Sequence, residues 1–489
     1  MFTSIRASKT SSPTAVLCAF TSDLKRRKHD DIPQRLRETF ACGIKQAGFK
    51  AQNGETILVE GKLLIVGGGD RDLASSDTAR KAGARFAKEI ERFEINSILV
   101  HPRLNTSDAE AAILSRAFAE GIGLSQWRLQ GYDGTASKDH TTSGALSIAA
   151  VRSASNKALK EGLLVANATN EARRIAATPP NVCNPTWVAK EAKKAARSLG
   201  LTCRIIDFKK AKELGMGGIV NVGIGSKSKP CLIQLDYRPT RTSRAAKNEH
   251  LVLVGKTMTY DSGGYSLKVN NGMKGMKYDM CGGAAVFGAM HAIAQANLPI
   301  KVTALLPTAE NLVSDEAYRP DDIITMFNGV TVEVTNTDAE GRLVLGDALA
   351  YACKRLKPTA IIDLATLTGG VVVALGQFSS GLWCNNDDLR DTIDEASASS
   401  DEKVWRLPLW DEHREFMRSP FADILNSNPK RAAHPIQGAA FLSYFVTDDL
   451  PWAHIDIAGV GTLENSPITG HGPTGYGVRL LYDLARLKS

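Results

Sequence analysis

Two short segments of this sequence bring acidic, basic and glycine residues together in a pattern suited to hydrolytic chemistry. Residues 331–342 read TVEVTNTDAEGR and carry two carboxylates two positions apart, Asp338 and Glu340. Residues 255–281 read GKTMTYDSGGYSLKVNNGMKGMKYDMC and carry two more carboxylates and two lysines: Asp261, Asp279, Lys256 and Lys268. Four carboxylates in one crevice repel one another unless cations neutralise them, and two divalent ions carry the matching charge. The sequence therefore predicts a two-metal site built from oxygen ligands.

A site of this kind has a defined chemistry. Two metal ions held close together can bind one water or hydroxide between them, lower its pKa and polarise a substrate carbonyl. Oxygen-rich ligation without histidine is unusual for zinc and also suits manganese, cobalt or magnesium. A lysine beside two cations either becomes a deprotonated ligand or, as an ammonium group, stabilises a developing oxyanion. Arg342 can hold a small anion with its planar guanidinium.

Each of these acids also has a purely structural interpretation. Asp279 could cap the N-terminus of the helix that follows it. Asp338 and Glu340 could be turn and first-turn acids that the helix dipole favours. These interpretations treat the acids separately. They do not explain why all four stand at strand ends among glycines, which let a ligand approach the backbone.

Other catalytic groups have little support in the sequence. None of the nine histidines forms HExxH or a similar ligand pair, so a histidine-ligated zinc site is not indicated. His291 is expected within a helix and His454 within a strand, where core or surface roles fit both. Ser262 stands in DSGG and not in the GxSxG elbow of serine hydrolases.

The first third of the chain alternates short apolar strands with helical stretches, as a small α/β unit does. Apolar residues at helical spacing predict a helix over residues 77–92. The GGGD sequence at 67–70 follows a strand but lacks the full dinucleotide fingerprint, so a tight turn is expected there. The strands expected in this part are Val16–Phe20, Thr56–Leu58, Leu63–Val66 and Ser97–Val100.

Stronger strands follow from about residue 181. Amphipathic helices are expected over residues 283–296 and 342–356. Buried strands alternating with such helices indicate a mainly parallel sheet covered on both faces, whose ligands bind beyond the carboxyl ends of the strands. Both chemistry-bearing segments begin at such ends. The expected strands are His250–Val254, Val302–Leu306, Thr331–Val334, Ala360–Leu364 and Ala453–Ile457.

The chain of 489 residues is longer than one hydrophobic core usually serves. A polar, alanine-rich helix is expected over residues 155–178, and Pro179 and Pro180 end it. We therefore expect an N-terminal α/β domain over residues 1–160, a connecting helix over 161–180 and a catalytic domain over 181–489. The expected fold class is α/β, with a small N-terminal domain and a C-terminal domain whose mainly parallel, mixed central sheet has helices on both faces.

Composition narrows the setting. The net charge of +8 permits nucleic-acid contact, but no Lys/Arg block with interleaved aromatics argues for it. No apolar run is long enough to cross a bilayer. The eight cysteines are scattered without a CxxC pair, which fits a reducing compartment, and a cytoplasmic location is expected. Whether the first ~13 residues are a targeting segment stays open.

Several segments together resemble the cytosol, or leucyl, aminopeptidases. NTDAEGRL at 336–343 looks like the signature of that family, and GKTMTYDSGGYSLK and MKYDMCGGAAV resemble its other metal-binding segments. The likeness continues through LPTAEN, AYRPDD, DLATLTGG, WRLPL and WAHIDIAG, and it covers most of the chain from about residue 175. The N-terminal part matches in general layout only. The family commonly has Gly, Phe and Pro where Thr257, Tyr260 and Val269 stand; these departures concern fine specificity and remove no ligand.

The resemblance implies a metal-dependent aminopeptidase that releases leucine and other apolar N-terminal residues from peptides. Asp261 and Glu340 would bridge two divalent ions. Zinc or manganese is expected, and cobalt or magnesium are the alternatives. Lys256 and Asp279 would complete one metal site and Asp338 the other. Lys268 would polarise the scissile carbonyl and Arg342 would hold a bicarbonate ion. The residues implied around the substrate are Lys268, Met276, Thr366, Leu367 and Gly369.

The resemblance also implies a homohexamer, a dimer of trimers. Two alternatives to peptide hydrolysis stay open at this stage. Some relatives also bind DNA, which the positive charge permits, although we do not expect it. The same carboxylates could serve a two-metal phosphoesterase, but a lysine ligand and the lack of an evident phosphate-binding loop argue against that activity.

Overall fold

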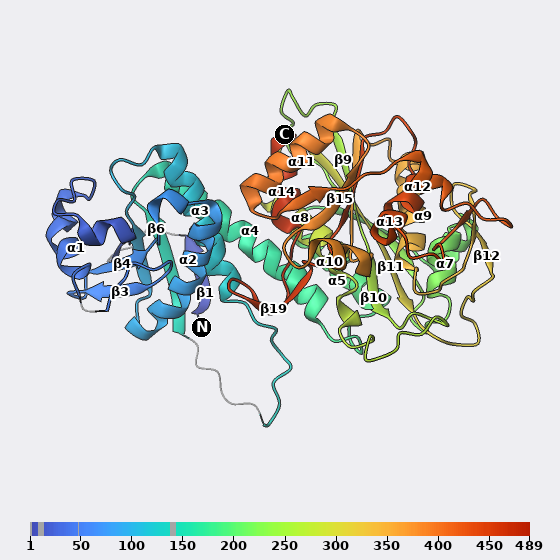
Figure 1. The fold of residues 1–489 in the computed structure, drawn as a ribbon, viewed down its shortest axis with the longest axis horizontal. Helices are drawn as coiled ribbons and strands as arrows, with labels where there is room; N and C mark the ends of the chain where they lie inside the picture. The colour runs from blue at the N-terminus through green and yellow to red at the C-terminus, as the bar shows by residue number, and fades with distance from the viewer. Residues whose placement is uncertain (1, 8–13, 47, 137–142) are drawn as a thin grey trace. The chain divides into compact units, whose positions relative to one another are not determined.

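The structure is a computed structural model that describes residues 2–7, 14–46, 48–136 and 143–489. The chain forms two compact units (Figure 1). The first comprises Met1–Asn170 with Glu464–His471, and the second comprises Glu171–Leu463 with Gly472–Ser489. Residues 8–13, part of the stretch considered as a targeting segment, lie outside the described residues. No helix among the described residues is long and apolar enough to cross a membrane.

The first unit is built on a six-stranded sheet with the order β1-β6-β5-β2-β4-β3. All neighbouring pairs are parallel except β3 with β4. The central strand β2 has β4 on one side and β5 on the other, so the chain changes direction across the sheet at β2. The strands are β1 Phe2–Ala7, β2 Thr14–Ala19, β3 Thr56–Val59, β4 Leu63–Gly67, β5 Ser97–Val100 and β6 Ser143–Ala150.

Helices α1 (Arg37–Gly43), α2 (Ser76–Glu89) and α3 (Asp108–Ser125) complete this unit. The predicted helix over 77–92 is α2, and its first turn is fixed because Ser75 Oγ accepts a hydrogen bond from Thr78 N at 3.3 Å. Its apolar face buries Ala82 and Phe86 against the sheet. The GGGD segment is the expected turn: Gly69 has φ +74°, and Asp70 caps a short 3-10 helix. The long helix α4 (Ser153–Ala177) follows β6 and ends two residues before Pro179.

The second unit holds a nine-stranded mixed sheet with the order β16-β15-β18-β14-β9-β11-β8-β7, in which β10 also pairs with β11. Its centre, from β18 through β14 and β9 to β11, is parallel, while β15, β8 and β7 run antiparallel to their inner neighbours. The strands are β7 Thr202–Ile206, β8 Cys231–Tyr237, β9 His250–Gly255, β10 Thr257–Asp261, β11 Lys301–Asn311, β14 Ala360–Ala365, β15 Ser380–Cys384, β16 Val404–Arg406 and β18 Trp452–Asp456.

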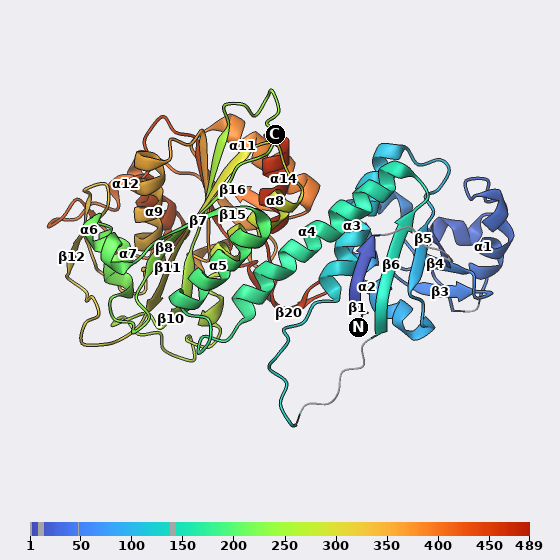
Figure 2. The same cartoon turned by 180° about the vertical axis from the view of Figure 1, so that it is seen from behind.

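Helices cover both faces of this sheet, as the continuous apolar strands predict. Every residue of β9 is buried. Its Val252 and Val254 belong to one core together with α9 (Gly341–Arg355) and α13 (His434–Ser443). Helix α8 (Cys281–Gln295) contacts β9, β11 and β14, and α5 (Pro185–Leu199) packs on α8 and the strands beside it (Figure 2). The other helices are α6 Phe208–Glu213, α7 Gly217–Gly223, α10 Gly369–Leu375, α11 Asp387–Ser400, α12 Asp411–Glu415 and α14 Val478–Leu487.

One expected strand of the large sheet lies elsewhere. Residues 331–333 form β13 (Thr331–Glu333), which belongs to a separate three-stranded sheet with β12 (Ile323–Thr325) and β17 (Ile424–Leu425). The prediction was wrong on this point. Val332 and Val334 are buried in the same core as the strands of the large sheet, so their apolar pattern is the same. Such a pattern predicts a buried strand but does not identify the strand with which it pairs. The remaining pair of strands is β19 (Thr462–Ser466) with β20 (Gly470–Pro473).

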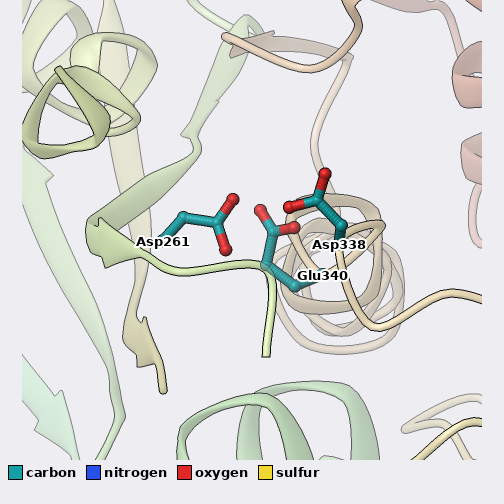
Figure 3. A group of neighbouring side chains, drawn as sticks. All are labelled: Asp261, Asp338 and Glu340. Carbon is teal, nitrogen blue, oxygen red and sulfur yellow. The ribbon is translucent and has the colours of Figure 1, made fainter. Parts of the chain in front are cut away.

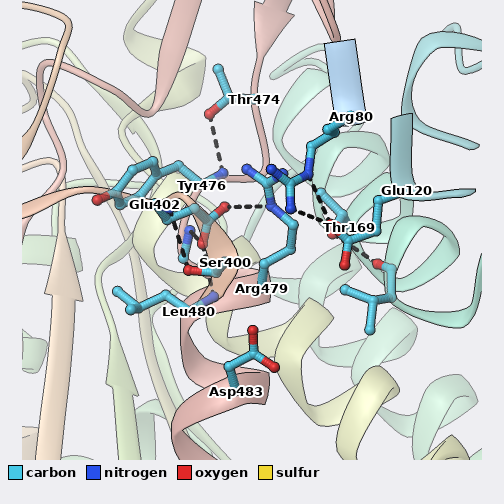
Figure 4. Close-up of polar contacts among 12 residues, drawn as sticks. Arg80, Glu120, Thr169, Ser400, Glu402, Thr474, Tyr476, Arg479, Leu480 and Asp483 are labelled. Atoms are coloured by element: carbon cyan, nitrogen blue, oxygen red, sulfur yellow. Dashed lines mark hydrogen bonds and ion pairs between the residues drawn. The ribbon is translucent and has the colours of Figure 1, made fainter. Parts of the chain in front are cut away.

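The last helix is anchored by a buried acid. Glu402 is 1% exposed, and its carboxylate accepts hydrogen bonds from the backbone N–H groups of Gly477 and Leu480, both at 2.9 Å (Figure 4). Arg479 Nε donates to the same carboxylate at 3.2 Å. A negative charge at the N-terminus of a helix satisfies free N–H groups and is stabilised by the helix dipole. Glu402 thereby fixes α14 to the segment that follows α11.

Candidate metal centre and active site

Three carboxylates converge beyond the strand ends of the second unit. Asp261 is the last residue of β10, and Asp338 and Glu340 lie in the loop that leads from β13 into α9. One oxygen of each acid lies within 4.8 Å of one oxygen of both others, and Figure 3 shows the three carboxylates pointing toward one another. Asp261 and Glu340 are buried. Oxygen atoms gathered in this way can hold a hard or borderline divalent cation.

Two lysines link these acids to a fourth. Lys256 immediately follows β9, and its Nζ lies 2.8 Å from Asp279 Oδ1 and 2.9 Å from Glu340 Oε1. Lys268 Nζ lies 2.8 Å from Asp261 Oδ2 and 2.5 Å from Asp338 Oδ1. Each lysine thus joins two acids that the sequence separates widely. With all six groups ionised, four carboxylates against two ammonium groups leave two negative charges, so the site attracts cations.

Glycines make this convergence possible. Gly263 and Gly264 have φ of +86° and +64°, and the chain turns there so that the backbone N–H of Gly263 donates to Asp261 Oδ1 at 2.9 Å. These left-handed conformations are open to glycine at no steric penalty. Gly341, the first residue of α9, gives Lys256 its space: a Cβ there would lie 2.3 Å from Lys256 Cε. The glycine-rich character of both segments is therefore part of the site.

Burial and crowding perturb the charges. Burial raises the pKa of Asp338 to about 6, and the neighbouring Asp261 and Glu340 add to the effect. Burial likewise raises the pKa of Asp279 well above its ordinary value, although Lys256 opposes it. Burial would lower the pKa of Lys256, but Asp279 and Glu340 outweigh burial and raise it. Strongly perturbed groups clustered at strand ends are typical of functional sites.

The donor set fits divalent cations and an anion. Asp279 Oδ2 is buried without a hydrogen-bond partner among the described residues, so this oxygen is available to a further cation. Arg342 Nε is also buried without a hydrogen-bond partner among the described residues, so its N–H is free to donate. Its Nη1 donates to Asn426 O at 2.9 Å. Burial lowers the pKa of Arg342 to about 10, which still leaves the guanidinium charged at neutral pH. A buried guanidinium with a free N–H suits a small anion such as bicarbonate.

Several supporting residues were missed by sequence reasoning. Asn311, the last residue of β11, donates from Nδ2 to Asp261 Oδ1 at 2.8 Å and to Thr337 O at 2.9 Å. Tyr318 Oη donates to Thr337 O at 2.7 Å. Asn426 receives the N–H of Thr335 at 2.8 Å. Asn311 and Tyr318 stand in the LPTAEN and AYRPDD segments, where the family resemblance was a signal that these positions matter.

Of the residues expected around a substrate, some contact the carboxylate and lysine cluster directly and others lie on the segments next to it. Thr366 is closest in its contacts, because its Oγ1 donates to Asp279 Oδ1 at 2.9 Å and its carbonyl accepts from Lys256 Nζ at 2.9 Å. Leu367 N donates to Asp456 Oδ1 at 3.0 Å, which fixes the loop before α10. Gly369 begins α10 with open space around its Cα. Met276 begins a 3-10 helix that leads to Asp279 and is half-buried.

The structural alternatives for the acids and histidines can now be compared with the geometry. The residue at the N-cap of α8 is Met280, and the Asp279 side chain bonds to Thr366, so Asp279 is no helix cap. Glu340 occupies the N-cap position of α9 without a side-chain cap bond. His454 is fully buried in β18, where its Nδ1 lies 2.5 Å from Asp363 Oδ1. His291 lies within α8. Both histidines therefore have the structural placement that the sequence predicts.

Fold and site together define a two-unit α/β protein with a lysine-bridged cluster of carboxylates beyond strand ends of the second unit. Comparison with known proteins gives the family. Residues 170–482 match the Cytosol aminopeptidase family, catalytic domain, and residues 16–134 match its N-terminal domain. The chain belongs to the cytosol aminopeptidase family. It is accordingly an aminopeptidase, a hydrolase of the peptidase class.

The similarity extends over most of the chain. A probable cytosol aminopeptidase of Desulforapulum autotrophicum is 37% identical over 481 residues, covering 94% of this chain and 91% of its own. One from Aquifex aeolicus is 38% identical over 440 residues, covering 88% and 87%. The solved structure of the bottromycin maturation enzyme BotP in complex with Mn is 31% identical, with a TM-score of 0.83 and coverage of 97% of this chain and 100% of that one.

Proposed function

We propose that this protein is a two-metal aminopeptidase that removes leucine and other apolar residues from the N-termini of peptides. The observation that carries the proposal is the arrangement of two lysines, each bridging two carboxylates from separate elements, at the rim of the central sheet. Peptidase hydrolysis needs an activated water and a stabilised tetrahedral oxyanion. The carboxylate cluster would provide the activated water through the cations it binds. Lys268 would stabilise the oxyanion.

In this proposal, five residues hold the metals: Lys256, Asp261, Asp279, Asp338 and Glu340. Two bound divalent ions would supply Lewis-acid activation of water and of the scissile carbonyl. Zinc or manganese suits the donor set, with cobalt or magnesium as further candidates. The manganese in the structure of the bottromycin maturation enzyme supports this choice, since that chain aligns over the full length of the fold.

The protein's own residues position the reaction. Lys268 is half-buried and presents its ammonium group beside Asp261 and Asp338, where it can polarise the carbonyl and stabilise the developing oxyanion. Arg342 would hold a bicarbonate ion, which would supply a proton acceptor beside the attacking water. Met276, Thr366, Leu367 and Gly369 form the pocket for the first side chain of the peptide.

The assembly and the domain roles belong to the same proposal. Residues 1–160 would form the N-terminal domain, 161–180 the connecting helix and 181–489 the catalytic domain. We infer a homohexamer in the cytoplasm. Val373 on α10 is 90% exposed and Phe378 just beyond it is 83% exposed, which supports an interface in this part of the surface. Light scattering of the purified protein would test the assembly, and a monomeric mass would contradict it.

The test of activity uses leucine-p-nitroanilide and its N-acetylated analogue with metal-loaded and metal-free protein. We expect turnover of the free-amine substrate only, dependent on manganese or zinc, because an exopeptidase must recognise the α-amine. No turnover by metal-loaded protein would overturn the proposal. Equal turnover of the blocked substrate would show a hydrolase that is not specific for the N-terminus. Faster turnover of a phosphate ester than of the peptide analogue would favour the phosphoesterase alternative.

A further inference from the structure

The first unit contains a cavity of about 250 Å³ that the peptidase site does not use. Its floor is formed by the carboxyl ends of three adjacent parallel strands: Val16 and Cys18 of β2, Val66 of β4 and Val100 of β5. Strand β2 lies where the chain changes direction across the sheet. In open α/β sheets the crevice at such a switch point is the general place for a ligand.

The interior of the cavity is mainly apolar. Helices α2 and α3 form its walls with residues such as Ala79, Ala82, Leu114 and Phe118. Cavities that take drug-sized molecules have volumes of about 300–1,000 Å³. At about 250 Å³ this one is smaller, so it suits a ligand of amino-acid size better than a nucleotide with base, sugar and phosphate.

Two residues that line the cavity each have a buried polar atom with no hydrogen-bond partner among the described residues. Ser155 is 1% exposed, and its Oγ is buried and unpaired. Asn53 donates from Nδ2 to Thr78 O at 3.0 Å, which leaves its buried Oδ1 free to accept. Unsatisfied buried polar atoms are rare in native proteins and point to a partner that carries the matching group. Both atoms can accept a hydrogen bond, so a ligand with an N–H donor can satisfy both.

Charged groups also line the cavity. Arg71, with a half-exposed side chain, stacks over the Phe20 ring at 5.6 Å. It belongs to a cluster of three arginines and two aspartates, Arg26, Arg71, Arg103, Asp23 and Asp31, which carries one excess positive charge. Within the cluster, Arg71 is the arginine least engaged, since its Nη1 is 3.8 Å from Asp31 whereas Arg103 Nη2 is 2.6 Å away. Glu110, an exposed acid, also lines the cavity.

We propose that this cavity binds a free amino acid with a large apolar side chain. The side chain would fill the apolar interior, the carboxylate would pair with Arg71, and the ammonium group would donate to Asn53 Oδ1, Ser155 Oγ and Glu110. A guanidinium and a carboxylate lining one apolar cavity are complementary to a zwitterion. That this ligand is also the product of the enzyme, so that the cavity senses product, rests on the proposed function.

The test is calorimetric titration of the full-length protein after metal removal with EDTA, so that the peptidase site lacks its cations. The ligands are leucine, phenylalanine, leucinamide without the carboxylate, 4-methylpentanoate without the amine, and AMP. We expect leucine or phenylalanine to bind at one site per chain. Leucinamide and 4-methylpentanoate should each bind at least tenfold more weakly, because each lacks one of the two charges.

Three variants locate the binding. Arg71→Gln should lower the affinity for leucine at least tenfold. Ala79→Leu fills the cavity and should abolish leucine binding. Lys88→Gln removes a charge from the exposed face of α2, does not line the cavity and should bind like the wild type. Thermal unfolding checks that each variant is folded.

The proposal is overturned if neither leucine nor phenylalanine binds, or if binding is unchanged in both Arg71→Gln and Ala79→Leu. It is also overturned if AMP binds more tightly than leucine and Ala79→Leu abolishes AMP binding. Peptide hydrolysis by the metal-loaded protein is measured separately on the same preparations. If the wild-type protein binds leucine but does not hydrolyse peptides, the result counts against the proposed function alone. If it hydrolyses peptides but does not bind leucine, the result counts against the proposed cavity ligand alone.

Discussion

Replacing Gly341 with alanine tests the geometry of the proposed site more sharply than removing a ligand would. A Cβ at this position would lie 2.3 Å from Lys256 Cε and 2.6 Å from Lys256 Nζ. Carbon atoms in contact prefer about 3.5 Å, so Lys256 Cε would have to move by about 1.2 Å. Lys256 is 3% exposed and is held by Asp279, Glu340 and the carbonyl of Thr366, so no free space receives it.

The expected effect on activity is large and the effect on stability small. A displacement of about 1 Å in a catalytic constellation can lower the rate by about a hundredfold. Overpacking costs about 1–3 kcal/mol, whereas exchanging glycine for alanine in a helix returns up to about 1 kcal/mol. We therefore expect kcat/KM for leucine-p-nitroanilide to fall about a hundredfold while the free energy of unfolding falls by no more than about 2 kcal/mol.

The assay compares Gly341→Ala with Gly144→Ala, in a strand of the first unit where an added Cβ meets no atom within 4 Å. Steady-state hydrolysis, thermal unfolding and metal content by elemental analysis are measured on both. Wild-type kcat/KM in Gly341→Ala with full metal content would refute the reasoning, because it would mean that the position of Lys256 is unimportant. Global unfolding of the variant would refute the stability estimate.

Further predictions concern single groups. Lys268→Ala should retain fold and metal but lose about a hundredfold in kcat, the scale for losing an oxyanion donor; an unchanged kcat would remove this role. Asp338→Asn should lower the metal bound per chain on elemental analysis after dialysis, and unchanged stoichiometry would contradict its assignment as a ligand. Burial and then Lys301 lower the pKa of His250 from 6.5 to about 4. Because the unfolded chain binds the proton more readily, stability should fall as pH drops from about 6.5 to about 4, by up to about 3 kcal/mol from this group. His250→Gln should flatten that part of the pH–stability curve from chemical denaturation; an unchanged slope would show that another group titrates.

Much of the fold was readable from local pattern. The strand Ser97–Val100 and the helix over 77–92 are marked by apolar periodicity, and Pro179 and Pro180 mark the end of α4. These features depend on a few neighbouring residues. The placement of Thr331–Val334 in the large sheet failed because burial alone does not reveal which strand a segment pairs with.

The candidate site shows the same division. Four acids, two lysines and glycines near strand ends were visible as residue types, and the family signature gave their order along the chain. The sequence did not indicate that Lys256 faces Asp279 and Glu340 while Lys268 faces Asp261 and Asp338. Nor did it indicate that Asn311 and Tyr318 hold the loop carrying Asp338.

The sequence by itself determined which chemical groups are present, where regular structure begins and ends, and to which family the chain is similar. Only the tertiary structure decided which groups meet, and whether a cavity lies beneath the first unit's helices. The physical reason is that hydrogen-bonding propensity and apolar period act between near neighbours in the chain. Contacts such as Lys256 with Glu340 join residues far apart in sequence, and the packing of whole strands and helices sets their distance.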